Sequence, residues 1–507
     1  QSLTFFLGMF ESKPILFSSQ PQKCHKISVF ENRFMKLVSS IFSKYRIYVA
    51  IQEEKTGTMR SVEERSPGIT YQQLLDEDTH PVPDVLRLES AKSFGPDEFP
   101  ITRYTTRQWH EVEKEKLWSR VWQYACRADE IPEVGDYYVY EIVGKSYVVM
   151  RSSENEIKAY PNACLHRGRK LKDYDGRCSE IRCPFHGFAW ELDGELKDVP
   201  AKWDFPHVEA ESFHLPEVQV GTWAGFVFIN PDPDAESLED FIGDLDDHFQ
   251  VWDLERRYKQ AHVAKVIHAN WKIAQEAFCE AFHVNATHPQ IMAYLGSTNS
   301  QVDVWDNFSR VISPGGTPEP LLDYEVSEEE QLRSMLDVSY DKELPITIPE
   351  GATMRAHAAA MSRDRWRPMA GDWVDSMSDA EMMDSIDYTL FPNFHPWGAF
   401  NRIVYRFRPN GDDHRSSIME CIFLAPYPEG NKPGPAPIHW LSDDENFSDA
   451  PELDTLGKVF DQDVFNMAKV QLGLETTQKT GVVLSNYQES KVRWLHQKLT
   501  EWCGEGE

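Results

Sequence analysis

The chain has 507 residues, enough for two or three domains that each have a hydrophobic core. Its formal net charge of −30 argues against binding to nucleic acid or to an anionic membrane, and 15 Trp, 19 Tyr and 28 Phe favour a packed globular protein. Eight Cys do not suggest a disulfide framework, so we expect a cytoplasmic protein with no membrane partner.

The first 58 residues differ in charge from the rest of the chain. They contain eight Lys or Arg and four Glu, a balance of +4, whereas the remainder carries −34. Lys36, Lys44 and Arg46 interrupt the apolar stretch 34–51, which argues against a transmembrane helix. We expect residues 1–58 to be an atypical extension that the chemistry does not need. A targeting segment is the alternative.

A polar N-terminal segment and a small β domain come next. Residues 59–117 are expected to pack on a later domain, and apolar positions near one face predict a helix over 105–122. Strands are predicted at 137–142, 147–151, 156–160, 188–192 and 223–230. These short strands predict an antiparallel β domain over residues 118–232, which we call the cluster domain.

Two loops of the cluster domain carry the most specific pattern in the chain. Cys164 and His166 form C-x-H, and Cys183 and His186 form C-x-x-H further on. Each loop offers one thiolate and one imidazole, which suits a Rieske [2Fe–2S] cluster with two Cys on one iron and two His on the other. A structural Cys2His2 zinc site is the alternative, but such sites usually pair like ligands in each loop.

Residues 233–507 are predicted to form a larger second domain. Helices are expected at 237–254, at 272–288 and at the C-terminus, and long strands at 386–391, 402–409 and 416–426. The fold class is therefore α+β, a small antiparallel β domain followed by a helix-flanked antiparallel sheet. The sequence contains no GxGxxG or Walker loop, which argues against a nucleotide site in the chain itself.

The second domain contains the pattern E-x-x-H-x-x-x-x-H at Glu280, His283 and His288. Two imidazoles and one carboxylate form the facial triad of non-haem Fe(II) oxygenases, although ordinary surface or core histidines produce the same pattern. Residues five apart on a helix lie about 140° apart around its axis, so a shared metal ion requires a break or a bulge. Asn285 and Pro289 favour a break.

The residues alone leave the carboxylate of this triad open. Glu280 is near in sequence, and Asp461, Asp463 and Glu475 lie on a predicted late helix. Any of these side chains offers a carboxylate oxygen to a hard metal ion.

These segments resemble the catalytic α subunits of the Rieske non-haem iron oxygenases, the ring-hydroxylating oxygenase family. The resemblance covers about residues 100–500 and is carried by Cys164-Leu165-His166-Arg167-Gly168, Cys183-Pro184-Phe185-His186-Gly187-Phe188, Asn270-Trp271-Lys272 and Glu280-Ala281-Phe282-His283 through His288-Pro289. It implies a Rieske domain followed by a catalytic domain with a mononuclear Fe(II). The implied iron ligands are His283, His288 and Asp463, since Asp463 matches the family's late-helix aspartate better than Asp461 does.

The resemblance also implies a role for Glu280 and a set of partners. Glu280 would be a bridge between the iron ligand His283 and a cluster ligand, His186 or His166, of a neighbouring subunit. Glu stands here where many family members have Asp. Such a path requires a ring, and the family forms trimers, so a homotrimer with or without a β subunit is implied. NAD(P)H would supply electrons through a separate reductase, directly or through a ferredoxin.

The implied reaction is reductive activation of O2 with hydroxylation of a small organic substrate. Cis-dihydroxylation of an aromatic ring is our leading hypothesis. The alternatives are monohydroxylation or demethylation of a methylated amine or aryl ether, and a pure electron-transfer Rieske protein. Expected pocket walls, each of which can also be an ordinary core residue, are Phe278, Phe282, Phe391, Phe394 and Trp397.

Overall fold

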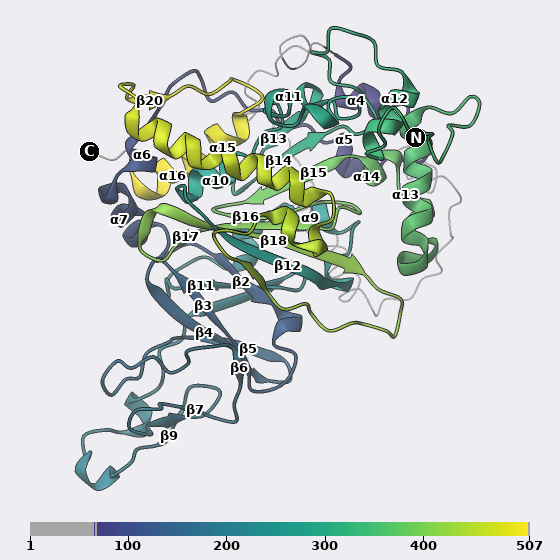
Figure 1. Cartoon of the computed structure of the whole chain (residues 1–507). Coiled ribbons are helices and arrows are strands. Elements are labelled where there is room, and N and C mark those ends of the chain that lie inside the picture. The colour runs from purple at the N-terminus through teal and green to yellow at the C-terminus, as the bar shows by residue number, and fades with distance from the viewer. Residues whose placement is uncertain (1–64, 66–67, 505–507) are drawn as a thin grey trace, which may run out of the picture. The chain divides into compact units, whose positions relative to one another are not determined.

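A computed structural model of the chain describes residue 65 and residues 68–504. The extension predicted for residues 1–58 lies outside these described residues. Within them, helices and antiparallel strands form the α+β arrangement that the sequence predicts (Figure 1). None of the described helices combines the length and the apolar character needed to cross a membrane.

The N-terminal segment consists of short elements that contact the second half of the chain. These elements are α4 (Tyr71–Leu75), α5 (Asp84–Arg87), β1 (Phe99–Pro100), α6 (Thr102–Thr105) and α7 (Arg107–Lys116). Arg103 of α6 donates to the backbone oxygen of His496, and the buried Glu113 of α7 accepts from Lys272 at 2.6 Å. These contacts between residues distant in sequence hold the N-terminal segment against α10 and α16 of the second half of the chain.

Three small antiparallel sheets make up the cluster domain. Their orders are β10-β11-β2, β5-β4-β3-β6 and β7-β8-β9, and Figure 1 shows β7 and β9 at the end away from the large sheet. The strands are β2 (Gln123–Arg127), β3 (Asp136–Ile142), β4 (Lys145–Ser153), β5 (Glu156–Pro161), β6 (Gly176–Arg177), β7 (Ile181–Arg182), β8 (Ala189–Trp190), β9 (Leu196–Asp198), β10 (Gln219–Trp223) and β11 (Phe226–Asn230).

Two predicted elements differ in the structure. The helix predicted over 105–122 ends at Lys116, and the next residues, including the fully buried Leu117 and Trp118, turn the chain toward β2. The strand predicted over 223–230 is instead the hairpin of β10 and β11. Its two turn residues, Ala224 and Gly225, both have positive φ angles, 50° and 80°, as a tight two-residue hairpin turn requires.

Eight strands form the large sheet of the second half, in the order β13-β14-β15-β16-β17-β18-β12-β19. Neighbouring strands are antiparallel, except that β19 runs parallel to β12. The strands are β12 (Arg257–Ile267), β13 (Gln301–Val304), β14 (Phe308–Ser313), β15 (Ser385–Leu390), β16 (Phe394–Pro396), β17 (Ile403–Asn410), β18 (Asp413–Pro426) and β19 (His439–Leu441).

Helices cover the large sheet and connect its strands. They are α8 (Leu238–Ile242), α9 (Leu245–Phe249), α10 (Trp271–Glu276), α11 (Val284–Thr287), α12 (Glu328–Met335), α13 (Met354–Ala370), α14 (Asp379–Met383), α15 (Leu456–Thr476) and α16 (Ser490–Cys503), and a short β20 (Gly481–Val482) pairs with β1. The helix predicted over 237–254 is divided into α8 and α9, because Gly243 leaves the helical conformation with a φ of 54°.

The large sheet separates the cluster domain from the helices that carry the second site. On one face, Ile422 of β18 belongs to a core shared with Phe226 of the cluster domain. On the other face, Phe423 packs with Ile273 of α10 and Phe460 of α15. Successive side chains of a strand point to opposite faces, so neighbouring residues of β18 serve the two different cores.

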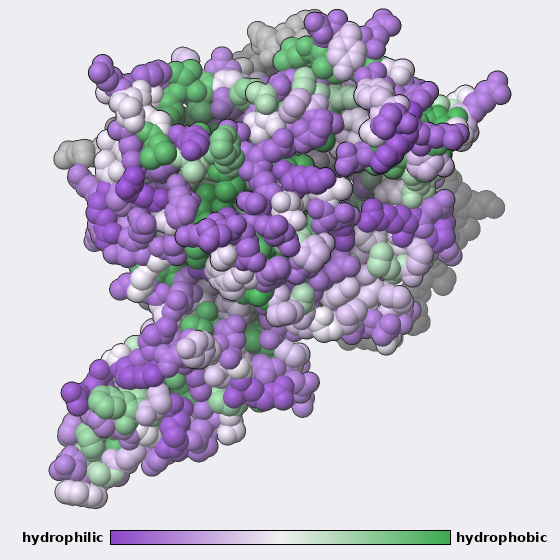
Figure 2. All heavy atoms as spheres, viewed as in Figure 1, coloured by the Kyte–Doolittle hydropathy of each residue, from purple (hydrophilic) through white to green (hydrophobic). Residues whose placement is uncertain are grey.

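Helix α15 also has an apolar outer face. Figure 2 shows hydrophilic residues over most of the viewed surface, with apolar residues gathered where Figure 1 places α15. Phe465, Val470 and Leu472 of this helix are all exposed, Phe465 by 66%. The helix therefore presents apolar surface both to the sheet and to the outside.

Candidate metal centres and substrate cavity

A break in the helix places the two histidines predicted to bind iron. α10 ends at Glu276, and helical structure resumes in the single turn α11. His283 precedes this turn, and His288 follows it with a non-helical backbone (φ −125°, ψ 55°). Pro289 then starts a 3-10 turn, because Pro fits the first position of a helical turn but cannot continue the one before it. The helix predicted over 272–288 is therefore interrupted, as a shared metal ion would require.

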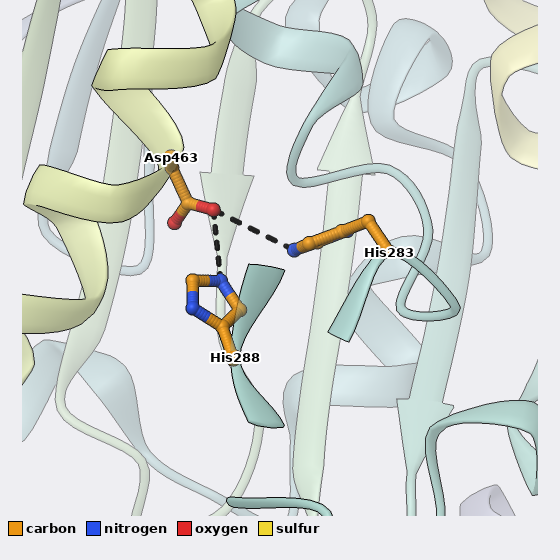
Figure 3. Close-up of side chains that lie close together, drawn as sticks. All are labelled: His283, His288 and Asp463. Carbon is orange, nitrogen blue, oxygen red and sulfur yellow. Dashed lines mark hydrogen bonds and ion pairs between the residues drawn. The ribbon is translucent and has the colours of Figure 1, made fainter. Parts of the chain in front are cut away.

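Asp463 of α15 lies beside both imidazoles (Figure 3). Its Oδ1 atom is 2.8 Å from Nε2 of His288 and 3.6 Å from Nε2 of His283. Ligand atoms held about 2.1 Å from one metal ion lie about 3 Å apart, so this spacing suits a common ion. Among the described residues, these three form the one cluster of metal-ligating side chains with donor atoms within 4.8 Å of one another.

A hydrogen bond engages the remote nitrogen of each imidazole. Glu280 Oε1 lies 2.6 Å from His283 Nδ1, and Gln462 Oε1 lies 2.8 Å from His288 Nδ1. Each oxygen accepts the Nδ1 proton, so the Nε2 lone pair that faces Asp463 is free for a metal ion. Burial disfavours a charged His283, but hydrogen bonding and charge from Glu280, followed by the Asp463 charge, raise its pKa. The pocket therefore attracts positive charge, which fits a cation.

The other carboxylates considered in the sequence have different partners. Asp461 accepts hydrogen bonds from the backbone N–H groups of Phe447 and Ser448, at 2.7 and 3.2 Å. Glu475 pairs with Arg415 at 2.7 Å. Neither belongs to the cluster around Asp463. Sequence reasoning did not single out Gln462, because its contact with His288 arises from folding and leaves no pattern in the chain.

The two loops predicted to hold the cluster have matching backbones. In each loop a backbone N–H four residues on, from Gly168 or Gly187, donates to the Cys carbonyl, at 2.8 Å for Cys164 and 3.0 Å for Cys183. Both glycines have positive φ angles, 75° and 83°, which a side chain would disfavour. The two loops therefore make the same kind of backbone turn, and each carries one Cys and one His.

The four side chains of these loops are compatible with the predicted cluster. Cys164 and Cys183 are 3% and 2% exposed, and the rings of His166 and His186 lie 4.8 Å apart. His166 Nδ1 is buried without a hydrogen-bond partner in the described part of the chain. Burial raises the pKa of the Cys164 thiol, while backbone N–H groups of His166 and Arg167 oppose this by bonding the sulfur. An iron cluster would satisfy the orphaned nitrogen and the buried sulfurs together.

A cavity of about 610 Å³ adjoins the Asp463 cluster. Its lining is mostly apolar and includes Phe278, as predicted, and Tyr405, whose rings lie 4.7 Å apart. Trp397, also predicted, lines it at 5.8 Å from the Tyr405 ring, and Phe460 lies at 5.9 Å. The cavity therefore has an aromatic wall beside the candidate iron ligands.

Three aromatic residues predicted as pocket walls do not line this cavity. Phe394 packs on the opposite face of the large sheet, where its ring lies 4.8 Å from Phe226. Phe391 belongs to the same core and stacks at 6.0 Å on Trp502. Phe282 is 37% exposed. The sequence shows that these residues are aromatic, but strand direction and chain turns decide which side they face.

Two family models match the chain in the predicted domain order. The model described as the Rieske [2Fe-2S] domain matches residues 121–210, and the model described as the ring hydroxylating alpha subunit (catalytic domain) matches residues 250–505. The cluster loops fall within the first match, and the Asp463 cluster falls within the second.

Curated relatives include oxygenases of several kinds. The chain is 32% identical over 196 residues to the carnitine monooxygenase oxygenase subunit of Escherichia coli (strain K12), covering 38% of this chain and 52% of that protein. It is 27% identical over 217 residues to the glycine betaine monooxygenase oxygenase subunit of Pseudomonas aeruginosa (strain UCBPP-PA14), covering 42% and 48%. For the anthranilate 1,2-dioxygenase large subunit of Acinetobacter baylyi (strain ATCC 33305 / BD413 / ADP1), the identity is 33% over 195 residues, covering 36% and 41%. The chain thus spans about half the length of these relatives.

Solved structures share the fold at low sequence identity. The quaternary ammonium Rieske monooxygenase CntA in complex with L-carnitine matches with a TM-score of 0.56 and 17% identity, over 80% of this chain and 95% of that chain. A naphthalene 1,2-dioxygenase variant bound to phenanthrene matches with a TM-score of 0.55 and 18% identity, over 82% and 94%. Since the catalytic-domain model alone matches half of the chain, the protein belongs to the ring-hydroxylating α-subunit family, with a Rieske domain ahead of its catalytic domain.

Proposed function

We propose that the chain is the oxygenase component of a Rieske non-haem iron system. The observation that carries the proposal is the meeting of two imidazoles and one carboxylate at the wall of an apolar cavity. When bound, the iron would supply O2 activation and the [2Fe–2S] cluster would supply electrons. The residues that would hold these groups are His283, His288 and Asp463 for Fe(II), and Cys164, His166, Cys183 and His186 for the cluster.

The chain's own residues orient the ligands and shape the reaction space in this proposal. Glu280 and Gln462 hold the Nδ1 protons and so direct each Nε2 atom toward Asp463. The aromatic wall beside Asp463 keeps a bound substrate close to the ligands and limits the water around it. The protein contributes to oxygen chemistry of this kind by positioning the substrate and by excluding water from the cavity.

Electrons would reach the chain from outside. The sequence has no nucleotide-binding motif, so a separate reductase would oxidise NAD(P)H, with or without a ferredoxin between them. Phe185, between the ligands of the second loop, is 60% exposed and gives a carrier access to the cluster. We propose a homotrimer, with or without a β subunit, in which Glu280 links His283 to the cluster of a neighbouring subunit. One solved relative is described by its inter-subunit electron transfer.

A methylated amine is the substrate class that we favour. The relatives named for carnitine and glycine betaine act on quaternary ammonium compounds that also carry a carboxylate. Trp397 and Tyr405 can hold an ammonium group through cation–π attraction. Arg365, an exposed residue at the cavity wall, can hold a carboxylate. These side chains support a substrate with a positive and a negative end.

The proposed reaction places one oxygen atom of O2 in a C–H bond next to the nitrogen. The second oxygen atom takes up two electrons from the reductase and two protons, and leaves as water. The resulting carbinol breaks its C–N bond and releases an amine and an aldehyde.

The test uses the full chain loaded with both iron centres, NADH and a surrogate reductase. We expect mass spectrometry to detect the amine and aldehyde from carnitine, glycine betaine or a related compound, with one NADH oxidised per product. The Asp463→Ala variant should form none. A red-brown protein whose cluster is reduced, but which forms no oxygenated product from methylated amines or aromatic amines, would overturn the proposal.

Dihydroxylation of an aromatic amine is a second candidate. The 33% identity to an anthranilate 1,2-dioxygenase large subunit favours it, and the aromatic wall of the cavity suits a flat ring. In the same assay this activity would give a product that retains both oxygen atoms of O2 and releases no aldehyde.

A further inference from the structure

Two polar side chains lie together on the sheet wall of the cavity. Asp387 of β15 and Trp397, just after β16, form an isolated antiparallel bridge and both line the cavity. Ser385, two residues before Asp387, lines it too, whereas Ile386 and Tyr388 belong to the core on the other face. The alternation along β15 therefore turns the Asp387 side chain toward the cavity face.

One carboxylate oxygen of Asp387 is bonded and the other is not. Oδ2 accepts from the fully buried Lys491 at 2.7 Å. Oδ1 is buried and has no hydrogen-bond partner among the described residues. His395 Nδ1 is 3.7 Å from Oδ1, beyond hydrogen-bond distance, and is already engaged by Thr389 Oγ1 at 2.9 Å. Asp387 is only 3% exposed, so bulk water does not supply a hydrogen bond to Oδ1.

Trp397 has the complementary unused group. Its Nε1–H is buried and also lacks a hydrogen-bond partner within the described part of the chain. A buried polar group without a partner costs about 1–3 kcal/mol. Asp387 thus offers an unused acceptor and Trp397 an unused donor, on neighbouring residues of one cavity wall. A ligand group that bonds to both gains binding energy that an apolar wall would not give it.

The local charge decides which ligand group suits this place. Lys491 balances the charge of Asp387, so the pair is close to neutral. Burial lowers the pKa of His395 against the opposing effect of Asp387, which disfavours a charged ring at this wall. A neutral group that both donates and accepts fits such surroundings better than a bare cation, and a hydroxyl group does both with one atom.

We propose that Asp387 and Trp397 form a hydroxyl-binding subsite, so that the preferred substrate carries an alcohol or phenol group. The hydroxyl donates to Asp387 Oδ1 and accepts from Trp397 Nε1. This inference rests on the proposed function, because the cavity is the substrate cavity only if Asp463 and its neighbours hold iron. The two residues are specificity determinants, and they leave the metal ligands untouched.

The test compares ligands that differ only in the hydroxyl group. L-carnitine is paired with γ-butyrobetaine, choline with ethyltrimethylammonium, and tyramine with phenethylamine. Binding of each to the full chain is measured by titration calorimetry, and turnover is measured separately. For at least one pair, we expect the wild type to bind the hydroxyl compound at least about 10-fold more tightly, since a site built for a hydroxyl leaves its polar groups unpaired with the analogue.

Variants assign the preference to the two side chains. Trp397→Phe keeps a ring but removes the donor. A weaker cation–π attraction lowers the affinity of both members of a pair, whereas loss of the donor affects only the hydroxyl compound, so the hydroxyl preference should fall at least about 3-fold. Asp387→Asn should reduce it as well, and its thermal unfolding is measured because Lys491 loses its ionic partner. Trp305→Phe makes the same chemical change outside the cavity and should leave the preference unchanged.

The outcomes separate the subsite from the proposed function. Equal affinity within every pair, or no binding of any compound, overturns the subsite. The same holds for a preference that survives in Trp397→Phe. Product formation from both members of a pair at equal kcat/KM would then leave the oxygenase proposal standing. A hydroxyl preference in binding, without any oxygenated product, leaves Asp387 and Trp397 as a hydroxyl-binding site but rejects the oxygenase function and, with it, their role in choosing a substrate.

Discussion

Gln462 and Asp463 are adjacent in the chain and act on the same imidazole. Asp463 approaches Nε2 of His288, and Gln462 approaches its Nδ1. The spacing of Cys and His residues was enough to predict the candidate Cys and His ligands, because a metal site needs particular donor types close together, whereas Asp463 was chosen through the family resemblance. Gln462, Asp387 and Trp397 could not be predicted in this way, since an amide, a carboxylate or an indole in a chain has no marked spacing and acquires its role only from its neighbours.

Replacement of Asp463 tests the choice of carboxylate. Asp463→Ala should lose mononuclear iron and at least about 100-fold in turnover, while the visible spectrum of the cluster stays, because the two sites share no ligand. Iron content and absorption spectra measure both effects. Asp461→Ala is the matched control on the same helix, and it should keep its iron since Asp461 caps a turn at Phe447. The reverse pattern would show that the assignment is wrong.

Replacement of Gln462 tests the hydrogen bond to His288. Gln462→Leu removes the acceptor for Nδ1, so the imidazole loses its orientation and Fe(II) affinity should fall about 10- to 100-fold. Titration of the iron-free protein with Fe(II) measures the change. Gln290→Leu is the control, because Gln290 touches Gln462 but not the imidazole. Equal affinities in wild type and Gln462→Leu would remove Gln462 from the site.

At the scale of elements, the long strands were predicted from the sequence, whereas some turns between elements were not. The predicted strands 386–391 and 402–409 agree with β15 and β17 to within one residue at each end, and the predicted strand 416–426 lies inside β18. These strands were predictable because their apolar runs are long. The break before His288 was also predicted, from the need to bring two histidines together. The hairpin turn at Ala224 was missed, since a non-glycine residue with positive φ leaves little trace in a sequence.

The link between the N-terminal segment and α14 gives a pH prediction. Asp78 accepts from the backbone N–H of Ala380, and burial, with nearby Asp384, raises its pKa to about 6 against the opposing charge of Arg355. The ordinary pKa of an Asp is near 3.8. Between these values the folded protein keeps a proton that the unfolded chain has released. This group therefore adds stability as the pH falls from about 7 to 4.

Asp78→Asn should abolish that contribution. We expect the free energy of unfolding of the wild type, relative to the variant, to rise by about 2 kcal/mol between pH 7 and pH 4.5. Urea titrations at several pH values measure the difference. Asp76→Asn, a change on the surface two residues away, should follow the wild type. Parallel curves for wild type and Asp78→Asn would contradict the prediction.

At the scale of the whole molecule, the sequence predicted two kinds of domain but not how one sheet serves both. A residue such as Phe394 looks the same in sequence whether it faces the cluster domain or the cavity, and only the alternation of the folded strand decides. The exposed Phe465 and Leu472 on α15 are likewise surface that the single chain does not cover. Such surface on the helix that carries Asp463 is what the proposed trimer would bury.

The Glu280→Gln variant tests electron transfer between chains. Gln keeps the shape of Glu280 but replaces a charged acceptor by an amide, which cannot accept equally from two imidazoles. Both metals and the oligomer should remain, and turnover should fall at least about 100-fold. A second cavity, of about 240 Å³, is lined by both Glu280 and Glu489, so Glu489→Gln is the control and should have a smaller effect. Loss of iron would instead make Glu280 a ligand, and retained iron with normal turnover would reject both roles.

The hydrogen bond between Arg103 and His496 sets an order of events during synthesis. The cluster domain has all of its strands once residue 230 has left the ribosome, but the core that Phe226 shares with Ile422 is complete only after β18 has emerged. The segment around Arg103, although it emerges earlier, must wait for α16, the last helix of the chain described here. Truncation within α16 would therefore leave the segment around Arg103 without its partner and would remove Trp494 and Leu495 from the core that the large sheet shares with the cluster domain.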